Sequence, residues 1–234
     1  IVYLRSDGYG EYKAILGFLG PVIYHIMFSV VSKISSLISC AEYILRNKTG
    51  EIVAPSQITT NWLKNHVEIE INKPKLLYIG RIRKEKGIYS LLELIEEGKA
   101  DLTLSIVGIE KNFVNQISQD NVHLHEVESK EQNLIKFYDD HNIFILPSYT
   151  EGHPMVLLEA LARLRPVIIF RDIKHVVGNK KGIFIAERSS RGLLDQINYI
   201  KENYRSIQLE MKENKLPTKE EFLLRFSNLI LKSS

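Results

Sequence analysis

The stretch that decides the fold runs from Ile143 to Phe170 and reads IFILPSYTEGHPMVLLEALARLRPVIIF. Its first four residues form an unbroken apolar run, which is typical of a parallel strand buried on both faces. A polar loop follows, and we expect a helix to begin at Pro154, because proline suits the first helical position. A second apolar run, Val167–Phe170, predicts another strand. The stretch therefore predicts a strand–loop–helix–strand unit, the repeating element of a doubly wound α/β sheet.

Two carboxylates flank the start of the predicted helix. Glu151 lies in the loop above the carboxyl end of the first strand, where ligands of open α/β sheets bind. Glu159 lies about one and a half turns into the helix. The helix N-terminus offers free N–H groups and the positive end of a dipole, which suit phosphate, whereas carboxylates accept hydrogen bonds from sugar hydroxyls. The pattern favours a diphosphate ligand with a sugar at each end; the alternative places Glu159 on a solvated helix face.

From Lys75 onward the chain alternates strand-like runs with amphipathic segments. Strands are predicted at Lys75–Ile79, Leu102–Val107, Val122–His125, Ile143–Leu146, Val167–Phe170 and Gly182–Ala186. Helices are predicted at Ile88–Glu97, around Leu134, Ile135 and Tyr138, and around Leu193, Ile197 and Ile200. Six strands with alternating helices predict a Rossmann-like domain over residues 74–204.

The flanking parts of the chain are less regular. Short strands are predicted at Ile1–Leu4, Ser35–Ser39 and Glu51–Val53, a turn or short helix at Trp62, and a final helix with Phe222, Phe226, Leu229 and Ile230 on one face. Asn72-Lys73-Pro74 is the candidate linker, so we divide the chain into residues 1–73, 74–204 and 205–234. Because the chain starts within a strand-like run, we expect a fragment that lacks its beginning.

One long segment, Ala14–Ser32, carries no formal charge. Its length reaches the lower limit for a membrane-spanning helix. Glycine, proline and histidine residues interrupt it, and Lys13 and Lys33 bracket it. We therefore favour a helix that packs in the protein or lies on a membrane surface over one that spans.

The composition is that of an ordinary globular protein, with 44% hydrophobic and 25% charged residues. A formal net charge of +3 is too mild to indicate a nucleic-acid partner. The single cysteine, Cys40, excludes an intrachain disulfide and favours a reducing, cytoplasmic compartment. His123 and His125 share one face of a predicted strand, but no third ligand has suitable spacing, so we expect no metal.

A second candidate site follows the strand Lys75–Ile79. The loop from Gly80 to Gly87 reads GRIRKEKG, which matches neither the dinucleotide fingerprint nor the P-loop. Phosphate contact would therefore come from side chains, and the guanidinium of Arg81 and the ammonium of Lys86 suit a diphosphate. The alternative is a solvated basic loop.

Together these two motifs resemble those of glycosyltransferase family 4, the group 1 type with the GT-B fold. The phrase PSYTEGHPMVLLEALA holds a glutamate pair at the family's spacing, and GRIRKEKG matches the family's GR…KG phrase. The resemblance covers about Lys75 to Asn203. It implies a nucleotide-sugar-binding Rossmann-like half, preceded in residues 1–73 by the end of a Rossmann-like acceptor-binding half. The final helices, in residues 205–234, would return toward that first half.

The resemblance also implies residue roles. Glu151 would hold the donor sugar, and Glu159 the ribose of the nucleotide. Arg81 and Lys86 would bind the diphosphate and, with Glu151, make up the catalytic set. The implied donor-binding residues are Gly80, Arg81, Lys86, Glu151, Gly152, His153, Pro154, Met155, Val156 and Glu159. Glu126 and Val127 would border the nucleobase, and Asp7 would bind a sugar or acceptor hydroxyl or cap the next helix.

The function implied is a retaining glycosyltransferase that moves a sugar from a nucleoside-diphosphate sugar to a saccharide or lipid-linked acceptor. Surface polysaccharide or lipopolysaccharide synthesis would be its setting, without a metal or other cofactor. We expect a cytoplasmic protein, peripheral on the inner face of the membrane through residues 14–32, and inactive as this fragment alone.

Three departures from the family pattern leave other functions open. Arg5-Ser6-Asp7 stands where many members carry a catalytic-site histidine, and Arg165 and Asp172–His175 replace glycines. A non-catalytic nucleotide-sugar-binding or scaffold subunit and a sugar-nucleotide epimerase of similar fold remain alternatives. An unrelated Rossmann oxidoreductase is disfavoured, because the glycine fingerprint is absent.

Overall fold

The computed structural model describes residues 1–98, 101–109 and 119–232, which form two compact units. Unit 1 comprises Ile1–Thr59, Thr150–Met155 and Pro217–Ser234, and unit 2 comprises Thr60–Tyr149 and Val156–Leu216. The first break between them falls at Thr59 and Thr60, upstream of the boundary at 73 and 74 expected from the sequence.

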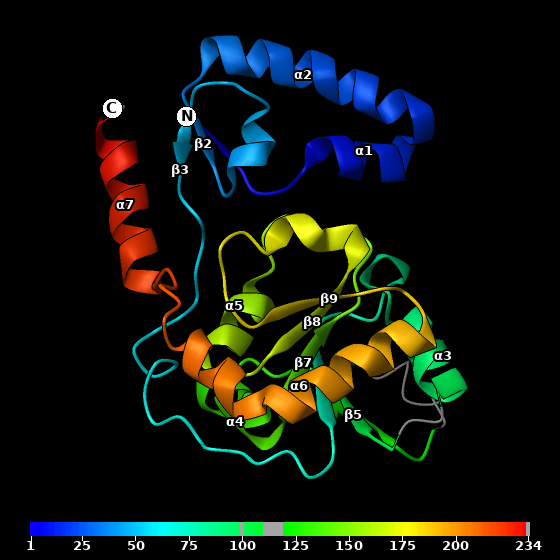
Figure 1. Cartoon of the computed structure of the whole chain (residues 1–234). Coiled ribbons are helices and arrows are strands. Elements are labelled where there is room, and N and C mark those ends of the chain that lie inside the picture. Colours follow the sequence, from blue (N-terminus) through cyan, green and yellow to red (C-terminus); the bar gives the residue numbers. More distant parts are fainter. Residues whose placement is uncertain (99–100, 110–118, 233–234) are drawn as a thin grey trace. The chain divides into compact units, whose positions relative to one another are not determined.

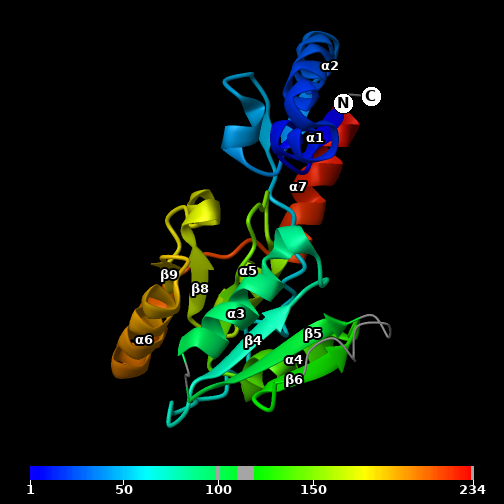
Figure 2. The same cartoon turned by 90° about the vertical axis from the view of Figure 1, so that its right-hand side faces the viewer.

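Unit 2 is built on a parallel six-stranded sheet of order β6-β5-β4-β7-β8-β9 (Figure 1). The strands are β4 (Lys75–Ile79), β5 (Thr103–Ile109), β6 (Val122–Glu126), β7 (Ile143–Leu146), β8 (Val167–Phe170) and β9 (Ile183–Ala186). Each lies within about two residues of its predicted place. Every residue of β7 and β8 is buried, as their unbroken apolar runs predict. Figure 2 shows β4, β5 and β6 running side by side.

Helices cover this sheet on both faces. They are α3 (Ile88–Gly98), α4 (Glu131–Asp140), α5 (Met155–Ala162) and α6 (Ser190–Met211), with 3₁₀ turns η3 (Lys84–Lys86) and η5 (Arg171–Val176). α3 and α6 pack against each other. Crossovers between parallel strands are right-handed as a rule, so the connections that run the opposite way along the sheet place α4 and α5 on its other face. α6 continues past residue 204, the predicted end of the domain, and buries Tyr204, Ile207 and Met211, so residues 205–216 belong to unit 2.

Two buried arginines explain why the segment before β4 belongs to unit 2. Arg163 and Arg165 are each 1% exposed and both pair with Asp139 of α4. Arg163 donates to the backbone carbonyls of residues 62, 64 and 65, and Arg165 donates to that of residue 67. Trp62 lies in a turn and packs edge-on against Tyr138. Residues 60–67 are therefore anchored to the six-stranded unit, and the polar residues 72–74 follow this anchor.

Unit 1 contains a parallel three-stranded sheet of β1 (Val2–Leu4), β2 (Leu37–Ser39) and β3 (Glu51–Ile52). Its helices are α1 (Gly8–Leu16), α2 (Gly20–Ile34) and α7 (Lys219–Lys232), with 3₁₀ turns η1 (Gly17–Leu19) and η2 (Glu42–Leu45). The final helix, α7, packs on this sheet: the Phe226 ring lies 5.1 Å from that of Tyr3, and Arg225 donates to the Ile52 carbonyl at 3.1 Å.

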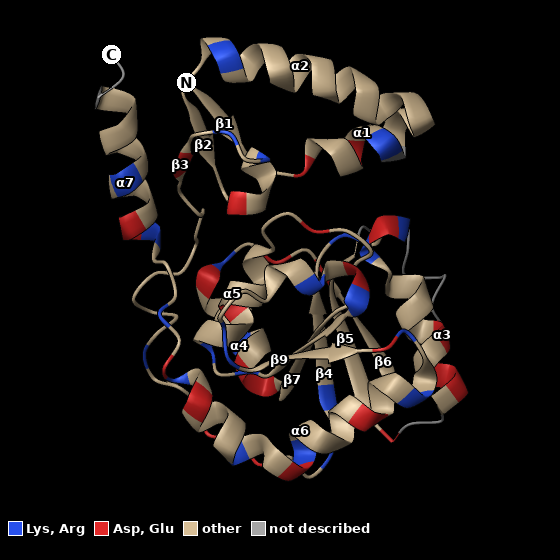
Figure 3. Ribbon diagram, turned by 45° about the horizontal axis from the view of Figure 1, so that its top comes forward, with Lys and Arg blue, Asp and Glu red and all other residues tan. Residues whose placement is uncertain are grey.

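The uncharged segment Ala14–Ser32 does not form one helix but turns back on itself. Gly17 adopts φ +63° after α1, and a Cβ at Gly20 would lie 2.0 Å from the Tyr12 carbonyl oxygen, so only glycine allows α1 and α2 to approach this closely. Gly17–Ile34 is long and apolar enough to cross a membrane by length and composition, and 11% of it is buried. α2 carries no Lys, Arg, Asp or Glu except Lys33 in its last turn (Figure 3).

Candidate functional site

The strands that precede the two sequence motifs, β4 and β7, are neighbours at the point where the strand order of the sheet reverses. From β4 the chain builds outward through β5 and β6, then returns to add β7, β8 and β9 on the other side of β4. In open α/β sheets, ligands bind outside the carboxyl ends of the strands at this reversal. The basic loop follows β4, and the loop with Glu151 follows β7, its immediate neighbour. Gly80 and Arg81 therefore lie at the binding edge of unit 2.

The start of the basic loop is held by backbone contacts that leave the Arg81 side chain exposed. The Tyr78 hydroxyl donates to the Arg81 carbonyl at 2.9 Å, and the Gly80 amide donates to the Val107 carbonyl at 2.9 Å. A Cβ at Gly108 would lie 2.6 Å from the Gly80 carbonyl oxygen, so the residue that follows β4 is in close contact with the end of β5. The backbone at Arg81 is fixed, and its guanidinium faces solvent.

The end of the basic loop packs closely against the loop after β7 and is hydrogen-bonded to it. Gly87 adopts φ +69° and a Cβ there would lie 2.0 Å from the Pro147 carbonyl oxygen. The Tyr149 amide donates to the Glu85 carbonyl at 2.9 Å. Lys86 lies between these two attachments and is half-buried. Contacts at both ends therefore hold the loop in a defined conformation. Arg81, Arg83 and Lys84 within it are exposed, as expected for the alternative of a solvated basic loop.

Glu159 is buried, which excludes the alternative of a solvated helix face. Its side chain is 8% exposed on α5, and the Tyr138 hydroxyl of α4 donates to its Oε2 at 2.9 Å. Tyr138 is itself fully buried and also contacts the Val156 carbonyl at 3.2 Å. Burial raises the pKa of the Glu159 carboxyl, while the hydrogen bond from Tyr138 lowers it. A buried carboxylate held by one donor has acceptor capacity left for ligand hydroxyls.

The loop from Glu151 to Met155 groups with unit 1 rather than with the residues of unit 2. Tyr43 donates to the Gly152 carbonyl at 3.1 Å, and His153 Nε2 lies 3.0 Å from the Pro55 carbonyl oxygen. A Cβ at Gly152 would lie 3.2 Å from the Ser6 Cα. The helix begins at Met155, one residue after the expected start at Pro154.

The predicted donor-binding set is therefore divided between the units. Gly80, Arg81, Lys86, Val156 and Glu159 lie in unit 2, and Glu151, Gly152, His153, Pro154 and Met155 lie in unit 1.

Three weaker candidates have clear positions. Glu126 and Val127 are exposed at the carboxyl end of β6, two strands from β4 on the same edge of the sheet. Asp7 caps α1, because its Oδ1 accepts from the Tyr9 amide at 3.3 Å, and the same oxygen pairs with Arg46. Its role toward an acceptor stays a prediction. His125 packs edge-on against Phe137, and the described residues contain no group of three possible metal ligands.

Sequence reasoning missed two residues that shape the site. Tyr138 was assigned only to the apolar face of a helix, and its hydrogen bond to Glu159 depends on tertiary packing. Arg188 was not singled out, although its guanidinium lies 4.0 Å from the Tyr149 ring centroid and 4.3 Å from that of Phe170. The sequence did offer one signal: Arg188 follows the carboxyl end of a predicted strand, as does Asp172 after the preceding strand.

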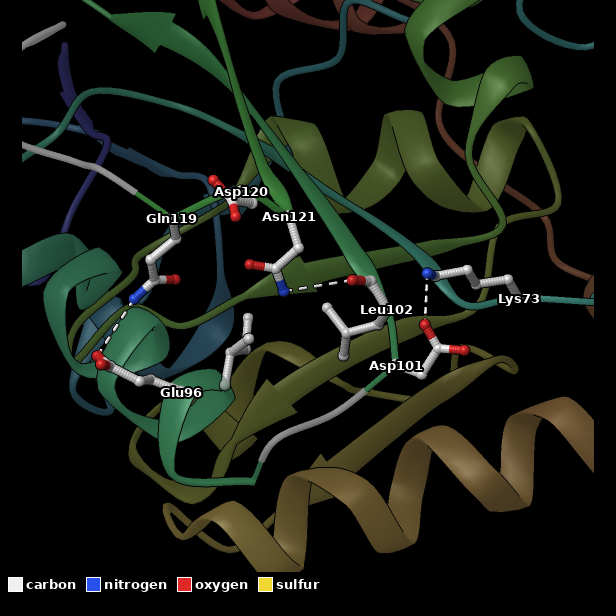
Figure 4. A pocket seen from close by; sticks show the side chains of 8 residues that line it. Lys73, Glu96, Asp101, Leu102, Gln119, Asp120 and Asn121 are labelled. Atoms are coloured by element: carbon white, nitrogen blue, oxygen red, sulfur yellow. Dashed lines mark hydrogen bonds and ion pairs between the residues drawn. The ribbon is translucent and has the colours of Figure 1, made fainter.

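A pocket lies at the opposite edge of the sheet, where β4, β5 and β6 begin (Figure 4). Several of its polar groups bond to one another: Lys73 pairs with Asp101, Gln119 donates to Glu96 at 3.3 Å, and Asn121 donates to the Leu102 carbonyl at 3.3 Å. This pocket is separate from the edge that carries both motifs, and we assign it no role in donor binding.

A comparison with protein-family models matches residues 62–216 to the family described as glycosyl transferases group 1. The match spans more than half of the chain and contains both motifs. The chain belongs to the group 1 glycosyl transferases. The resemblance stated from the motifs is thereby confirmed.

Curated relatives from three bacteria are each 28% identical to the chain. One, from Bacillus subtilis, is named as a glycosyltransferase of teichuronic acid biosynthesis, TuaC, and matches over 59% of this chain and 36% of its own length. CapM of Staphylococcus aureus, named as a capsular polysaccharide biosynthesis glycosyltransferase, matches over 51% and 34%. A Haemophilus influenzae protein named as an uncharacterized glycosyltransferase matches over 61% and 43%. The chain spans less than half the length of each of these relatives.

Two solved structures share the fold of this chain. Sucrose-phosphate synthase from Thermosynechococcus elongatus superposes with a TM-score of 0.74 at 17% identity, over 98% of this chain and 67% of that one. Anabaena HepE, solved in complex with UDP and glucose, gives 0.73 at 10% identity, over 97% and 70%. The expected α/β architecture of GT-B type is confirmed.

Proposed function

We propose that the chain contains the donor half of a retaining glycosyltransferase that uses a nucleoside-diphosphate sugar. The observation that carries this proposal is that two features of unit 2 follow neighbouring strands where the strand order reverses. They are the cationic loop Gly80–Gly87 after β4 and the buried Glu159 in the helix after β7. A cationic edge suits a diphosphate, and a buried carboxylate with spare acceptor capacity suits vicinal hydroxyls. A nucleoside-diphosphate sugar presents both groups.

In the proposed reaction the anomeric carbon exchanges its bond to a diphosphate oxygen for a bond to an acceptor hydroxyl oxygen, on the same face of the sugar, and the hydroxyl proton passes to the departing diphosphate. Arg81 and Lys86 stabilise the charge that develops on the leaving diphosphate, helped by the dipole at the start of α5. Glu159 holds the ribose, and Glu151 holds the transferred sugar. Because two cations and a helix dipole neutralise the phosphates, the proposal includes no metal.

The test is calorimetric titration of this chain with UDP, GDP and ADP. We expect one of the three nucleotides to bind, and Arg81→Ala to weaken that binding by about tenfold to about a hundredfold, since hydrogen bonds to charged groups contribute about 1.5–3 kcal/mol. Arg83→Ala is the matched control, because Arg83 is an exposed arginine in the same loop that the proposal does not use. A folded chain that binds none of the three nucleotides would overturn the proposal.

For the acceptor we propose a saccharide or a lipid-linked saccharide in the assembly of a bacterial surface polysaccharide. Support comes from the names of two relatives, which refer to teichuronic acid and to capsular polysaccharide. The test measures transfer of radiolabelled sugar to a lipid-linked saccharide. The donor is the sugar nucleotide whose base the titration identifies, and the assay uses the full-length protein to which this chain belongs.

We further propose that α1 and α2 contact a membrane surface on the cytoplasmic side, where a lipid-linked acceptor would be reached. The supporting observation is an exposed apolar stripe on α2, at the i, i+4 and i+8 spacing of one helix face. Its members, with the apolar turn before α2, are Phe18, Leu19, Val22, Ile23, Ile26, Met27, Val30 and Ile34. Lys13 and Lys33 border the uncharged segment and suit anionic headgroups.

A further inference from the structure

Arg188 occupies an unusual place at the edge of the sheet that carries both motifs. It lies between β9 and α6, and its side chain is only 18% exposed. Its Nε and Nη2 donate to Asp172 Oδ2 at 3.1 and 2.7 Å, and Nη2 also lies 3.4 Å from the Ser148 carbonyl oxygen. The guanidinium is sandwiched between the rings of Tyr149 and Phe170. One side chain thus joins segments that follow β7, β8 and β9.

The same side chain reaches the basic loop. A Cβ at Gly87 would lie 3.4 Å from Arg188 Nη1, so this nitrogen faces the glycine that ends the loop. Tyr149, which stacks on Arg188, fixes the other side of Lys86, because its backbone N–H donates a hydrogen bond to the Glu85 carbonyl. Within the described residues, Nη1 is buried and has no hydrogen-bond partner. Arg188 is therefore packed against both attachments of the segment that presents Lys86.

The charge of Arg188 does not make it a further phosphate cation. Asp172 neutralises it at 2.7 Å, and Asp172 stands in the segment that replaces the family's usual glycine-rich turn. What the position demands is the shape of a guanidinium, which is planar, stacks between two rings and donates in a fixed fork. Lysine keeps the charge but has neither the plane nor the fork.

We propose that Arg188 is a positioning residue that holds Glu85, Lys86 and Gly87 in the geometry that binds the donor diphosphate. This inference rests on the proposed function. It requires that loss of the guanidinium weakens binding of the diphosphate while leaving recognition of the nucleoside unchanged. A residue that only stabilises the fold would not separate the two.

The experiment measures the affinity of the preferred nucleoside diphosphate and of its parent nucleoside, for wild type and Arg188→Lys. We expect Arg188→Lys to lower the diphosphate affinity by about tenfold and the nucleoside affinity by less than about twofold. Arg171→Lys is the matched control, because Arg171 pairs with Glu187 nearby but is exposed, and we expect it to leave both affinities unchanged. Asp172→Asn retains Arg188, removes its carboxylate partner, and should shift the ratio in the same direction by a smaller factor.

The outcomes separate the two claims. If the wild type binds the nucleotide and Arg188→Lys leaves the ratio of diphosphate affinity to nucleoside affinity unchanged, this inference is overturned and the proposed function stands. If Arg188→Lys fails to fold, as judged by circular dichroism, the ratio measured with Asp172→Asn decides in its place. No nucleotide binding by the wild type would overturn the proposed function and this inference with it.

Discussion

At the scale of single residues, the protein keeps a carboxylate where burial disfavours it. Glu159 is nine-tenths buried beside Tyr138, and burial raises the pKa of its carboxyl. A raised pKa means that the folded chain holds the proton more tightly than the unfolded chain does. The contribution of this group to the free energy of unfolding is therefore full below about pH 4.5 and is lost as the pH rises through the folded pKa.

We expect Glu159→Gln to make the fold more stable at neutral pH and the site weaker. The stability gain over wild type should grow from about pH 4 to about pH 7, because glutamine does not ionise. Nucleotide affinity should fall about tenfold or more, since the charged acceptor for ribose is gone. Chemical denaturation across this pH range and calorimetry measure the two effects. Glu93→Gln on the exposed face of α3 is the control, and a pH-independent stability difference would contradict the account.

The sequence singled out Glu159 as a candidate but did not predict its surroundings. Spacing from Glu151 and the apolar runs on either side identified the residue, because these patterns are local. The buried hydroxyl of Tyr138 and the guanidinium of Arg188 reach the site from other elements, and single-sequence patterns carry no information on such pairings. The same limit applies to Gly87, whose contact with Pro147 joins loops far apart in the chain.

At the scale of elements, the strands were predictable and the boundaries between units were not. Fully apolar runs such as β7 and β8 follow directly from burial on both faces of a parallel sheet. The polar residues 72–74 looked like a linker, yet the break falls at Thr59 and Thr60 because Arg163 and Arg165 tie residues 62–67 to unit 2. The uncharged segment Ala14–Ser32 was expected as one helix, but Gly17 and Gly20 allow a tight turn within it.

The buried Asp139 pairs should be essential for the anchored segment. We expect Asp139→Asn to lower the free energy of unfolding by about 3 kcal/mol, because it leaves two buried guanidiniums without their carboxylate. The neighbouring Asp140→Asn should cost less than about 0.5 kcal/mol, since Asp140 forms only an exposed pair with Lys136. Urea denaturation of both variants measures the difference. Equal, small effects would show that the backbone carbonyls alone satisfy the two arginines.

Closure of the basic loop against the loop after β7 depends on Gly87. We expect Gly87→Ala to lower the free energy of unfolding by about 3 kcal/mol, because a methyl group would meet the Pro147 carbonyl and alanine disfavours positive φ. Gly178→Ala is the control with a similar φ of +57°, where a Cβ would meet only the flexible end of Lys180 at an ordinary contact distance of 3.5 Å, and should cost about 1 kcal/mol. Thermal unfolding compares them, and similar losses would contradict the close packing described here.

At the scale of the whole molecule, the chain combines a six-stranded unit with a smaller three-stranded unit. The smaller unit carries the exposed apolar face of α2, which a water-facing helix would normally avoid. We expect the chain to sediment with vesicles that contain phosphatidylglycerol, and a variant with Phe18→Glu and Ile26→Glu to bind them about tenfold more weakly. Leu224→Glu, an exposed leucine on α7, is the control. Equal sedimentation of wild type and the double variant would exclude this surface as the membrane contact.

We propose that the edge of the sheet at β4 and β7 binds the diphosphate and ribose of a sugar nucleotide. A crystal structure of the chain with the nucleotide that binds in titration tests it most directly. The account predicts the diphosphate within hydrogen-bond distance of Arg81 and Lys86, and the ribose hydroxyls on Glu159. A nucleotide bound instead at the opposite edge of the sheet, with Glu159 bonded only to Tyr138, would contradict it.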